Sequence, residues 1–223
     1  MERAIEELEF AVGELGLAGI EVGSNVNGVP IGDLRFWPFF EAAQALGAAI
    51  FVHPLRPAGM DRLVGPASLE QIVAFPGEIG LAAASIITSG LTTRFPRLRI
   101  ALSHGGGSIQ TLLPRMQFAW ERQLALRDAI PVAPGDAART LYYDDLLYSA
   151  VGIRALIDTV GDDRVMIGTD YPFAIMDTDP LRVWRLWGWA IAWRKRCDGE
   201  MRRRGWVWIR VFGMPRGLHL SGK

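Results

Sequence analysis

Four side chains with metal-binding chemistry each stand at the end of an apolar run. His53 ends AAIFVH, His104 ends RIALSH, Asp144 ends LYYD and Asp170 ends RVMIGTD. Imidazole nitrogens and carboxylate oxygens are donors that a divalent ion such as Zn²⁺ accepts together. A histidine taken alone is more often structural, and an aspartate such as Asp170 often only caps a turn. The trio of His53, His104 and Asp170 therefore indicates a metal site more strongly than any one member does, and we expect Asp144 near it.

Three glycines follow His104, at positions 105–107. A glycine run after a strand lets the backbone approach a ligand closely, or it simply allows a tight turn into the next helix. The sequence leaves both interpretations open.

Helical and strand patterns alternate along the first 180 residues. Apolar side chains at helical spacing are followed each time by a short, nearly continuous apolar run. Helices are expected at residues 4–16, about 36–46, about 80–94, about 108–127 and about 150–160, and strands at 18–22, 48–53, 99–104, 141–145 and 164–170. Strands of this kind are buried on both faces, as in parallel sheets covered by helices, so the sequence predicts an α/β fold.

Either a doubly wound sheet or a (β/α) barrel satisfies this alternation. In a barrel, polar side chains at the C-terminal ends of successive strands converge on one mouth, where barrel enzymes place their active sites. A doubly wound sheet would bring together only the side chains beside its switch point. The repeated strand-end chemistry therefore favours the barrel.

Composition excludes several classes of protein. The chain has 223 residues, of which 50% are hydrophobic and 22% charged, as in an ordinary globular protein. Its single cysteine, Cys197, excludes an internal disulfide and a thiolate metal cluster. No uninterrupted apolar stretch approaches the roughly 18–20 residues of a membrane span, and the start of the chain is acidic. We therefore expect a cytoplasmic protein with no membrane partner.

Residues 181–223 differ in composition from residues 1–180. The first part holds 13 Arg and 22 Asp or Glu, for a formal charge of −9, whereas the second holds 11 Arg or Lys and two acids, for +9, and six of the eight Trp. An amphipathic segment that binds membrane or nucleic acid would have this composition. A shift of reading frame in a GC-rich gene would also produce Arg, Trp and Gly. We favour the frame shift, so we expect a domain at 1–180, an anomalous, irregular tail at 181–223, and no nucleic-acid partner.

Four ordered motifs carry a family resemblance over about residues 5–180. They are FVHP (51–54), TRFPRLRIALSHGGG (93–107), YYDD (142–145) and VMIGTDYPF (165–173). Together they resemble the amidohydrolase-related family that contains aminocarboxymuconate-semialdehyde decarboxylase. The resemblance implies that His53 and Asp170 are metal ligands and that His104 is the acid/base acting with metal-activated water.

The same resemblance assigns two substrate-binding residues. Arg115, eleven residues after His104, matches an arginine that binds a substrate carboxylate, in the decarboxylase often across a dimer interface. Phe173 would line the substrate pocket. Without the family, Arg115 reads equally well as a solvated arginine of a helix. The implied partners are a small carboxylate substrate and, for the complete protein, a second copy of the chain in a homodimer.

One departure from the family concerns the missing ligands. Family members begin with a strand carrying a His-x-His pair, which this sequence lacks. Five strand candidates cannot close an eight-stranded barrel. We therefore expect a partial (β/α)8 barrel of the TIM type that lacks its N-terminal strands.

The predicted function is a metal-dependent decarboxylase of an unsaturated or aromatic carboxylic acid, using Zn²⁺ or alternatively Mn²⁺. The alternatives are a metal-dependent hydrolase of a lactone or amide with the same site, and a truncated, inactive fragment.

Overall fold

The computed structural model describes residues 1–187. Contacts between residues divide the chain into two compact units, Met1–Gly168 and Thr169–Lys223. The domain boundary expected at residue 180 stays a prediction.

The first unit alternates helices with strands, as the sequence predicts. Its helices are α1 (Glu2–Glu9), α2 (Trp37–Leu46), α3 (Phe75–Thr88), α4 (Leu91–Arg94), α5 (Ile109–Arg122), α6 (Leu124–Ala129), α7 (Pro134–Ala138) and α8 (Ala150–Val160). Its strands are β1 (Gly19–Gly23), β2 (Asn25–Val26), β3 (Val29–Pro30), β4 (Ala49–His53), β5 (Arg99–Leu102), β6 (Tyr142–Asp144) and β7 (Val165–Met166). Single π-helical turns occupy Phe10–Glu14 and Glu70–Ala74, and 3-10 turns occupy Leu34–Phe36, Met60–Arg62, His104–Gly106 and Asp162–Arg164.

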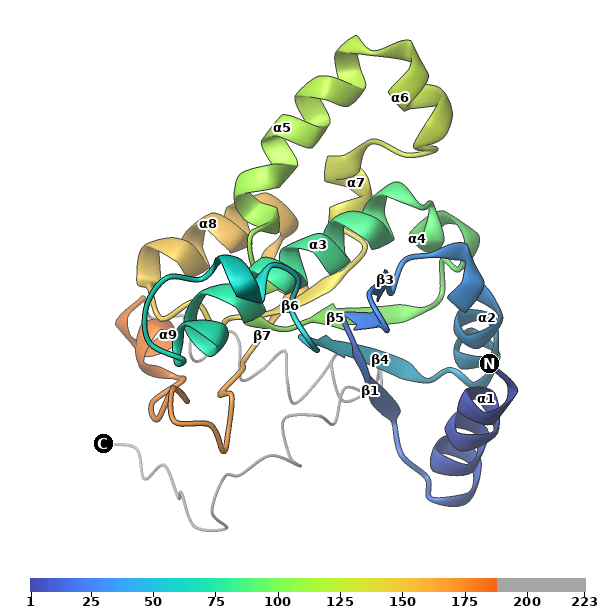
Figure 1. Cartoon of the computed structure of the whole chain (residues 1–223), viewed down its shortest axis with the longest axis horizontal. Coiled ribbons are helices and arrows are strands. Elements are labelled where there is room, and N and C mark those ends of the chain that lie inside the picture. The colour runs from blue at the N-terminus through green and yellow to red at the C-terminus, as the bar shows by residue number, and fades with distance from the viewer. Residues whose placement is uncertain (188–223) are drawn as a thin grey trace. The chain divides into compact units, whose positions relative to one another are not determined.

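Five strands form one parallel sheet in the order β1-β4-β5-β6-β7 (Figure 1). The register pairs Gly23 with His53 and Val52 with Leu102, so the C-terminal ends of β1, β4 and β5 lie at one edge of the sheet. Strands β2 and β3 form a separate antiparallel hairpin. The parallel α/β architecture predicted from the apolar runs is confirmed.

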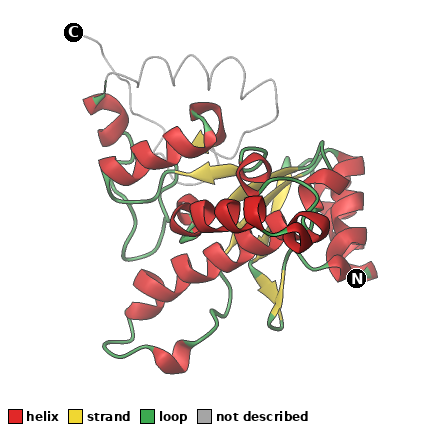
Figure 2. Cartoon of the chain, turned by 90° about the horizontal axis from the view of Figure 1, so that it is seen from above, coloured by secondary structure: helices red, strands yellow, loops and turns green. Residues whose placement is uncertain are grey.

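The two faces of the sheet differ because successive residues of a strand point to opposite sides. Val52, Leu102 and Tyr143 are neighbours in the register and are buried on one face. His53 and Asp144, one position further along β4 and β6, belong to the other face. Helices α3, α5 and α8 all lie on one side of the strands (Figures 1 and 2). The apolar face is thus the helix-covered one, and the chemistry is on the other.

Helix α3 is the central helix of the covering layer. It contacts α4, α5 and α7 and the 3-10 turn that begins at His104. Together with the π-helical turn before it, the stretch Glu70–Thr88 is long and apolar enough to cross a membrane by length and composition. Core helices of soluble proteins pass the same test, and 44% of the most apolar window is buried inside the protein. Its contacts place α3 in the core of the first unit.

Several element boundaries differ from the sequence-based expectation. The helix expected at about 80–94 is two helices, because Gly90 adopts a left-handed φ of 79° between α3 and α4. The helix expected at about 108–127 is likewise divided at Gln123, whose backbone is extended. The strand expected at 164–170 ends at Met166. There the Gly168 N–H donates to the Asp145 side chain and not to a neighbouring strand.

The second unit is described from Thr169 to residue 187. It contains a turn in which the Asp177 N–H donates to the Thr169 carbonyl at 2.9 Å, and helix α9 (Arg182–Leu186). Val183 and Trp184 of α9 are buried. Of the tail expected to be irregular, residues 182–186 are therefore helical, and residues 188–223 lie outside the described part of the chain.

Candidate metal centre

His53 is the last residue of β4, where the sequence analysis places it. Its backbone carbonyl accepts a hydrogen bond from the Ser24 N–H at 2.9 Å, which ties the end of β4 to the end of β1. Its side chain is partly exposed. The bond from Ser24 fixes the backbone from which the imidazole projects.

His104 lies just beyond its strand and not at the strand's end. Strand β5 stops at Leu102, and His104 begins a 3-10 turn with a left-handed φ of 54°. The three glycines at 105–107 also have positive φ, between 59° and 77°. At Gly107 a Cβ would lie 1.9 Å from the Pro76 carbonyl oxygen, so the chain reverses there against the start of α3 and only glycine fits. The glycine run therefore serves the close turn that the sequence left as one of two interpretations.

The two histidines come together at the ends of neighbouring parallel strands. Their ring centroids are 5.4 Å apart, and the rings meet edge to face. His104 is only 6% exposed. The predicted convergence of strand-end chemistry is confirmed for this pair, which lies within the first unit.

Asp144 lies beside the pair, as expected. Its Oδ1 accepts from the backbone N–H of Gly105 at 2.8 Å and of Leu146 at 3.1 Å, and the His104 N–H donates to the carboxylate as well. Burial raises the pKa of the Asp144 carboxyl group, and the nearby His104 and the N–H donors act against that rise. Asp144 thus holds the backbone of the turn that presents His104.

Asp170 belongs to the second unit. It stands four residues beyond the end of β7, with a left-handed φ of 58°, and its carbonyl accepts from the Phe173 N–H at 2.9 Å. Phe173 lies in the same turn and is 41% exposed. The expected roles of Asp170 as a metal ligand and of Phe173 as a pocket residue stay predictions.

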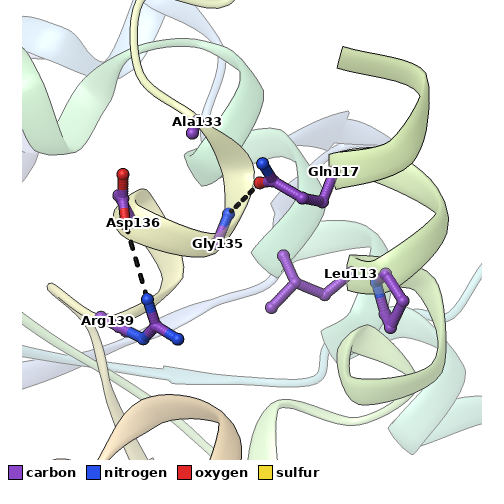
Figure 3. Close-up of a pocket in the computed structure, with 7 residues that line it drawn as sticks. Leu113, Gln117, Ala133, Gly135, Asp136 and Arg139 are labelled. Atoms are coloured by element: carbon purple, nitrogen blue, oxygen red, sulfur yellow. Dashed lines mark hydrogen bonds and ion pairs between the residues drawn. The ribbon is translucent and has the colours of Figure 1, made fainter. Parts of the chain in front are cut away.

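Arg115 is an exposed residue of α5. The same helix lines a pocket of about 340 Å³ (Figure 3). On one side are Leu113, Pro114 and Gln117 of α5, and on the other are Gly135 and Asp136 of α7 and Arg139, which follows α7. Two contacts join polar groups of that pocket to one another. Gln117 Oε1 accepts from the Gly135 N–H at 3.0 Å, and Arg139 pairs with Asp136 at 3.5 Å. Arg115 itself does not line this pocket, and its predicted contact with a substrate carboxylate stays a prediction.

Glu78, an acid in the first turn of α3 that is only 7% exposed, was not predicted from the sequence. Its Oε1 accepts from Ser24 Oγ at 3.2 Å and from Asn25 Nδ2 at 2.9 Å, and its Oε2 accepts from the Ala58 N–H at 3.0 Å. Glu78 therefore ties the segments that follow β1 and β4 to the central helix. A single acid within the apolar stretch FPGEIGLAA was the available signal.

The family follows from a comparison with models of known protein families. The model described as amidohydrolase (Amidohydro_2) matches residues 1–204, most of the chain. The chain belongs to this amidohydrolase family. The resemblance seen in the four sequence motifs is thereby confirmed.

Several proteins similar to this amidohydrolase chain are decarboxylases. A 2-amino-3-carboxymuconate-6-semialdehyde decarboxylase of Dictyostelium discoideum is 35% identical over 180 residues, which cover 80% of this chain and 50% of that protein. A crystal structure of 5-carboxyvanillate decarboxylase from Sphingomonas paucimobilis matches with a TM-score of 0.71 at 29% identity, covering 81% of this chain and 56% of that one. A structure of a dihydroxybenzoic acid decarboxylase from Polaromonas sp. JS666, with bound manganese and the inhibitor 2-nitroresorcinol, matches with a TM-score of 0.66 at 26% identity, covering 82% and 59%.

This amidohydrolase chain spans about half the length of the curated relatives it matches, between 50% and 58% of each. Its sheet corresponds to part of the barrel of the solved decarboxylases, which confirms the α/β class with a parallel sheet. Manganese is the metal named for one of these relatives, so the finding supports a divalent metal and does not single out zinc.

Proposed function

We propose that this chain carries part of the active site of a metal-dependent decarboxylase that acts on an unsaturated or aromatic carboxylic acid. The observation that carries the proposal is the His53–His104 pair, with ring centroids 5.4 Å apart at the ends of neighbouring parallel strands. The pair stands in a chain of the amidohydrolase family whose relatives include decarboxylases of such acids.

The donors fit a divalent cation. His53, His104 and Asp170 offer two imidazoles and a carboxylate, a set that suits Zn²⁺ and Mn²⁺. We assign His53 and Asp170 as ligands. The assignment of Asp170 is supported by its place in the chain. Asp170 follows Gly168, the last residue of the first unit, by two residues, and two residues span at most about 7 Å. The cation would supply positive charge that polarises bound groups and activates a water molecule.

His104 acts as the acid/base in this proposal. An imidazole can take up and release a proton near neutral pH, and the buried turn fixes His104 beside the predicted ligand His53. His104 delivers its proton to the carbon that bears the substrate carboxylate. The bond between that carbon and the carboxylate then breaks, its electron pair returns to the carbon skeleton, and CO₂ leaves.

Arg115 and Phe173 complete the proposed site. The guanidinium of Arg115 is a planar donor that suits a carboxylate, and its exposed position on α5 leaves it accessible to a second copy of the chain. We propose that Arg115 binds the substrate carboxylate in a homodimer and that Phe173 lines the substrate pocket. We also propose that the five strands are part of a (β/α)8 barrel that further strands complete.

A metal-dependent hydrolase of a lactone or amide is the second candidate, and the description of the family as amidohydrolase favours it. The products separate the two reactions. In D₂O, decarboxylation of a carboxyl-labelled substrate releases labelled CO₂ and leaves one deuterium on the carbon that carried the carboxylate. Hydrolysis releases no CO₂.

Cobalt titration of the chain tests the ligand assignment, with the visible absorbance of bound Co²⁺ as the signal. His53→Ala and Asp170→Ala are each expected to weaken binding at least about tenfold, because each removes a ligand. His104→Ala is expected to bind within about threefold of the original chain and to lower turnover by about 10²–10⁴-fold in the active assembly.

His219→Ala is the matched control, since His219 is the third histidine of the chain, and it should bind Co²⁺ unchanged. Unaltered binding in His53→Ala would overturn the site. Weakened binding in His219→Ala would show that a different set of residues holds the metal.

A further inference from the structure

Two consecutive aspartates stand where β6 ends, and each accepts hydrogen bonds from a different loop. Asp144 is the last residue of β6, and Asp145 comes directly after it. Both are buried, at 4% and 5% exposure. Successive residues of an extended chain point to opposite sides, so two adjacent carboxylates can serve two separate neighbours. Buried carboxylates need such partners, because an unpaired buried charge is costly.

Asp144 serves the turn of His104. Its carboxylate accepts the N–H groups of His104 and Gly105, and the Leu146 N–H closes the same cluster on Asp144 Oδ1. A left-handed conformation is unfavourable for a residue with a side chain, so partners outside the residue stabilise His104 at φ 54°. Asp144 provides them directly at the strained residue and at the one after it.

Asp145 serves the segment that leads to Asp170. Its Oδ1 accepts the Gly168 N–H at 2.8 Å, and its own backbone N–H donates to the Met166 carbonyl at 2.8 Å. The segment from Met166 to Gly168 is therefore held at two points. A Cβ on Gly168 would lie 2.8 Å from the Asp144 Cβ, so this segment passes close against the strand end. Asp170 follows two residues later.

We propose that Asp144 and Asp145 are positioning residues for two different loops. Asp144 holds the turn of His104, and Asp145 holds the base of the loop that carries Asp170. The roles of the two loops rest on the proposed function, whereas the division of the hydrogen bonds rests on the geometry alone. The two aspartates of the YYDD motif then form a clamp that holds two loops.

Selective ¹⁵N-glycine labelling tests the division, because Gly105 and Gly168 report on one clamp each. In Asp144→Ala, exchange of the Gly105 amide hydrogen should speed up roughly tenfold, as expected for the loss of one hydrogen bond to a carboxylate. Exchange at Gly168, which keeps its bond to Asp145 and loses only packing against Asp144, should change far less. In Asp145→Ala, the effect should fall on Gly168 and spare Gly105.

The asparagine variants keep the test sharp even if an alanine variant does not fold. Asn retains one acceptor oxygen, so Asp144→Asn should keep Gly105 exchange within about threefold of the original chain and shift only the amide resonances of the His104 turn. Asp145→Asn should shift only Gly168. Asp128→Asn is the matched control on the exposed surface of α6, and it should move neither amide.

Cobalt titration gives the functional arm of the test. Asp145→Ala should weaken Co²⁺ binding about tenfold, because it loosens the loop of a proposed ligand, and Asp144→Ala should leave Co²⁺ affinity within about threefold. Amide effects that spread over both loops in either variant would overturn the division. If the amide pattern holds but His53→Ala binds Co²⁺ as tightly as the original chain, the clamp stands and the proposed metal site fails. If Co²⁺ binds through His53 but the amide pattern is absent, the proposed metal site stands and the clamp fails.

Discussion

Removing the Glu78 carboxylate is expected to destabilise the first unit strongly. In Glu78→Ala, the Ala58 N–H loses the partner that the structure gives it, at about 1–3 kcal/mol for a buried donor left unsatisfied. The side chains of Ser24 and Asn25 also lie within hydrogen-bonding distance of the Leu55 carbonyl, so they keep a partner and lose only their bond to a charged group. Together these losses predict a decrease of about 3 kcal/mol in the free energy of unfolding.

Glutamine at position 78 should also be destabilising, although it has the same shape. Donors approach both carboxylate oxygens, so one end of the Gln amide must turn its NH₂ group towards another donor. We expect a loss of about 1–2 kcal/mol for Glu78→Gln.

Urea unfolding followed by tryptophan fluorescence measures these changes. Glu41→Ala, on the exposed side of α2, is the matched control and should stay within about 0.5 kcal/mol. A loss below about 1 kcal/mol in Glu78→Ala, or a Glu78→Gln variant as stable as the original chain, would refute the view that Glu78 ties the two strand-end segments to α3.

Two further predictions concern buried groups of the first unit. Burial raises the pKa of the Tyr143 phenol, so above about pH 10 the unfolded chain loses this proton first and stability falls as the pH rises. Tyr143→Phe should therefore lose less stability than the original chain between pH 9 and pH 11 in urea unfolding, whereas the exposed-site variant Tyr171→Phe should behave like the original chain. Gly107→Ala should lower stability by about 3 kcal/mol or more, because the new Cβ would collide with the Pro76 carbonyl at a positive φ. Gly13→Ala, where a Cβ meets open space, should change thermal stability by less than about 1 kcal/mol, and equal effects at the two glycines would contradict the collision.

The sheet could be predicted from the sequence because parallel strands buried by helices are continuous apolar runs. The run 48–53 became β4 and the run 99–104 became β5, each within two residues of its expected bounds. The predicted end of a strand was wrong where a side chain, and not a neighbouring strand, accepts the backbone hydrogen bond. The Asp145 carboxylate takes the Gly168 N–H, so β7 stops early, and no local pattern in RVMIGTD announces a partner 23 residues away.

The histidine pair could be predicted because both residues follow apolar strands of one parallel sheet, which fixes the edge at which they meet. The left-handed backbone of His104 could not be read from its residue type, since it depends on hydrogen bonds that the turn donates to Asp144 of β6. Glu78 escaped notice for a related reason. Its partners Ser24, Asn25 and Ala58 are polar groups of distant loops, and only the folded chain brings them to α3.

The strand order β1-β4-β5-β6-β7 has a consequence for how the chain is made. Each strand pairs with the strand of the sheet that precedes it in the chain, and paired residues are separated by 22 to 50 positions. The order in which the strands leave the ribosome is therefore the same as their order across the sheet. Each new strand extends an edge that already exists, and it closes a loop of moderate length at a cost that grows only slowly with its size. The sheet can thus grow during synthesis from its N-terminal strand onward, without waiting for a later strand to be inserted between earlier ones.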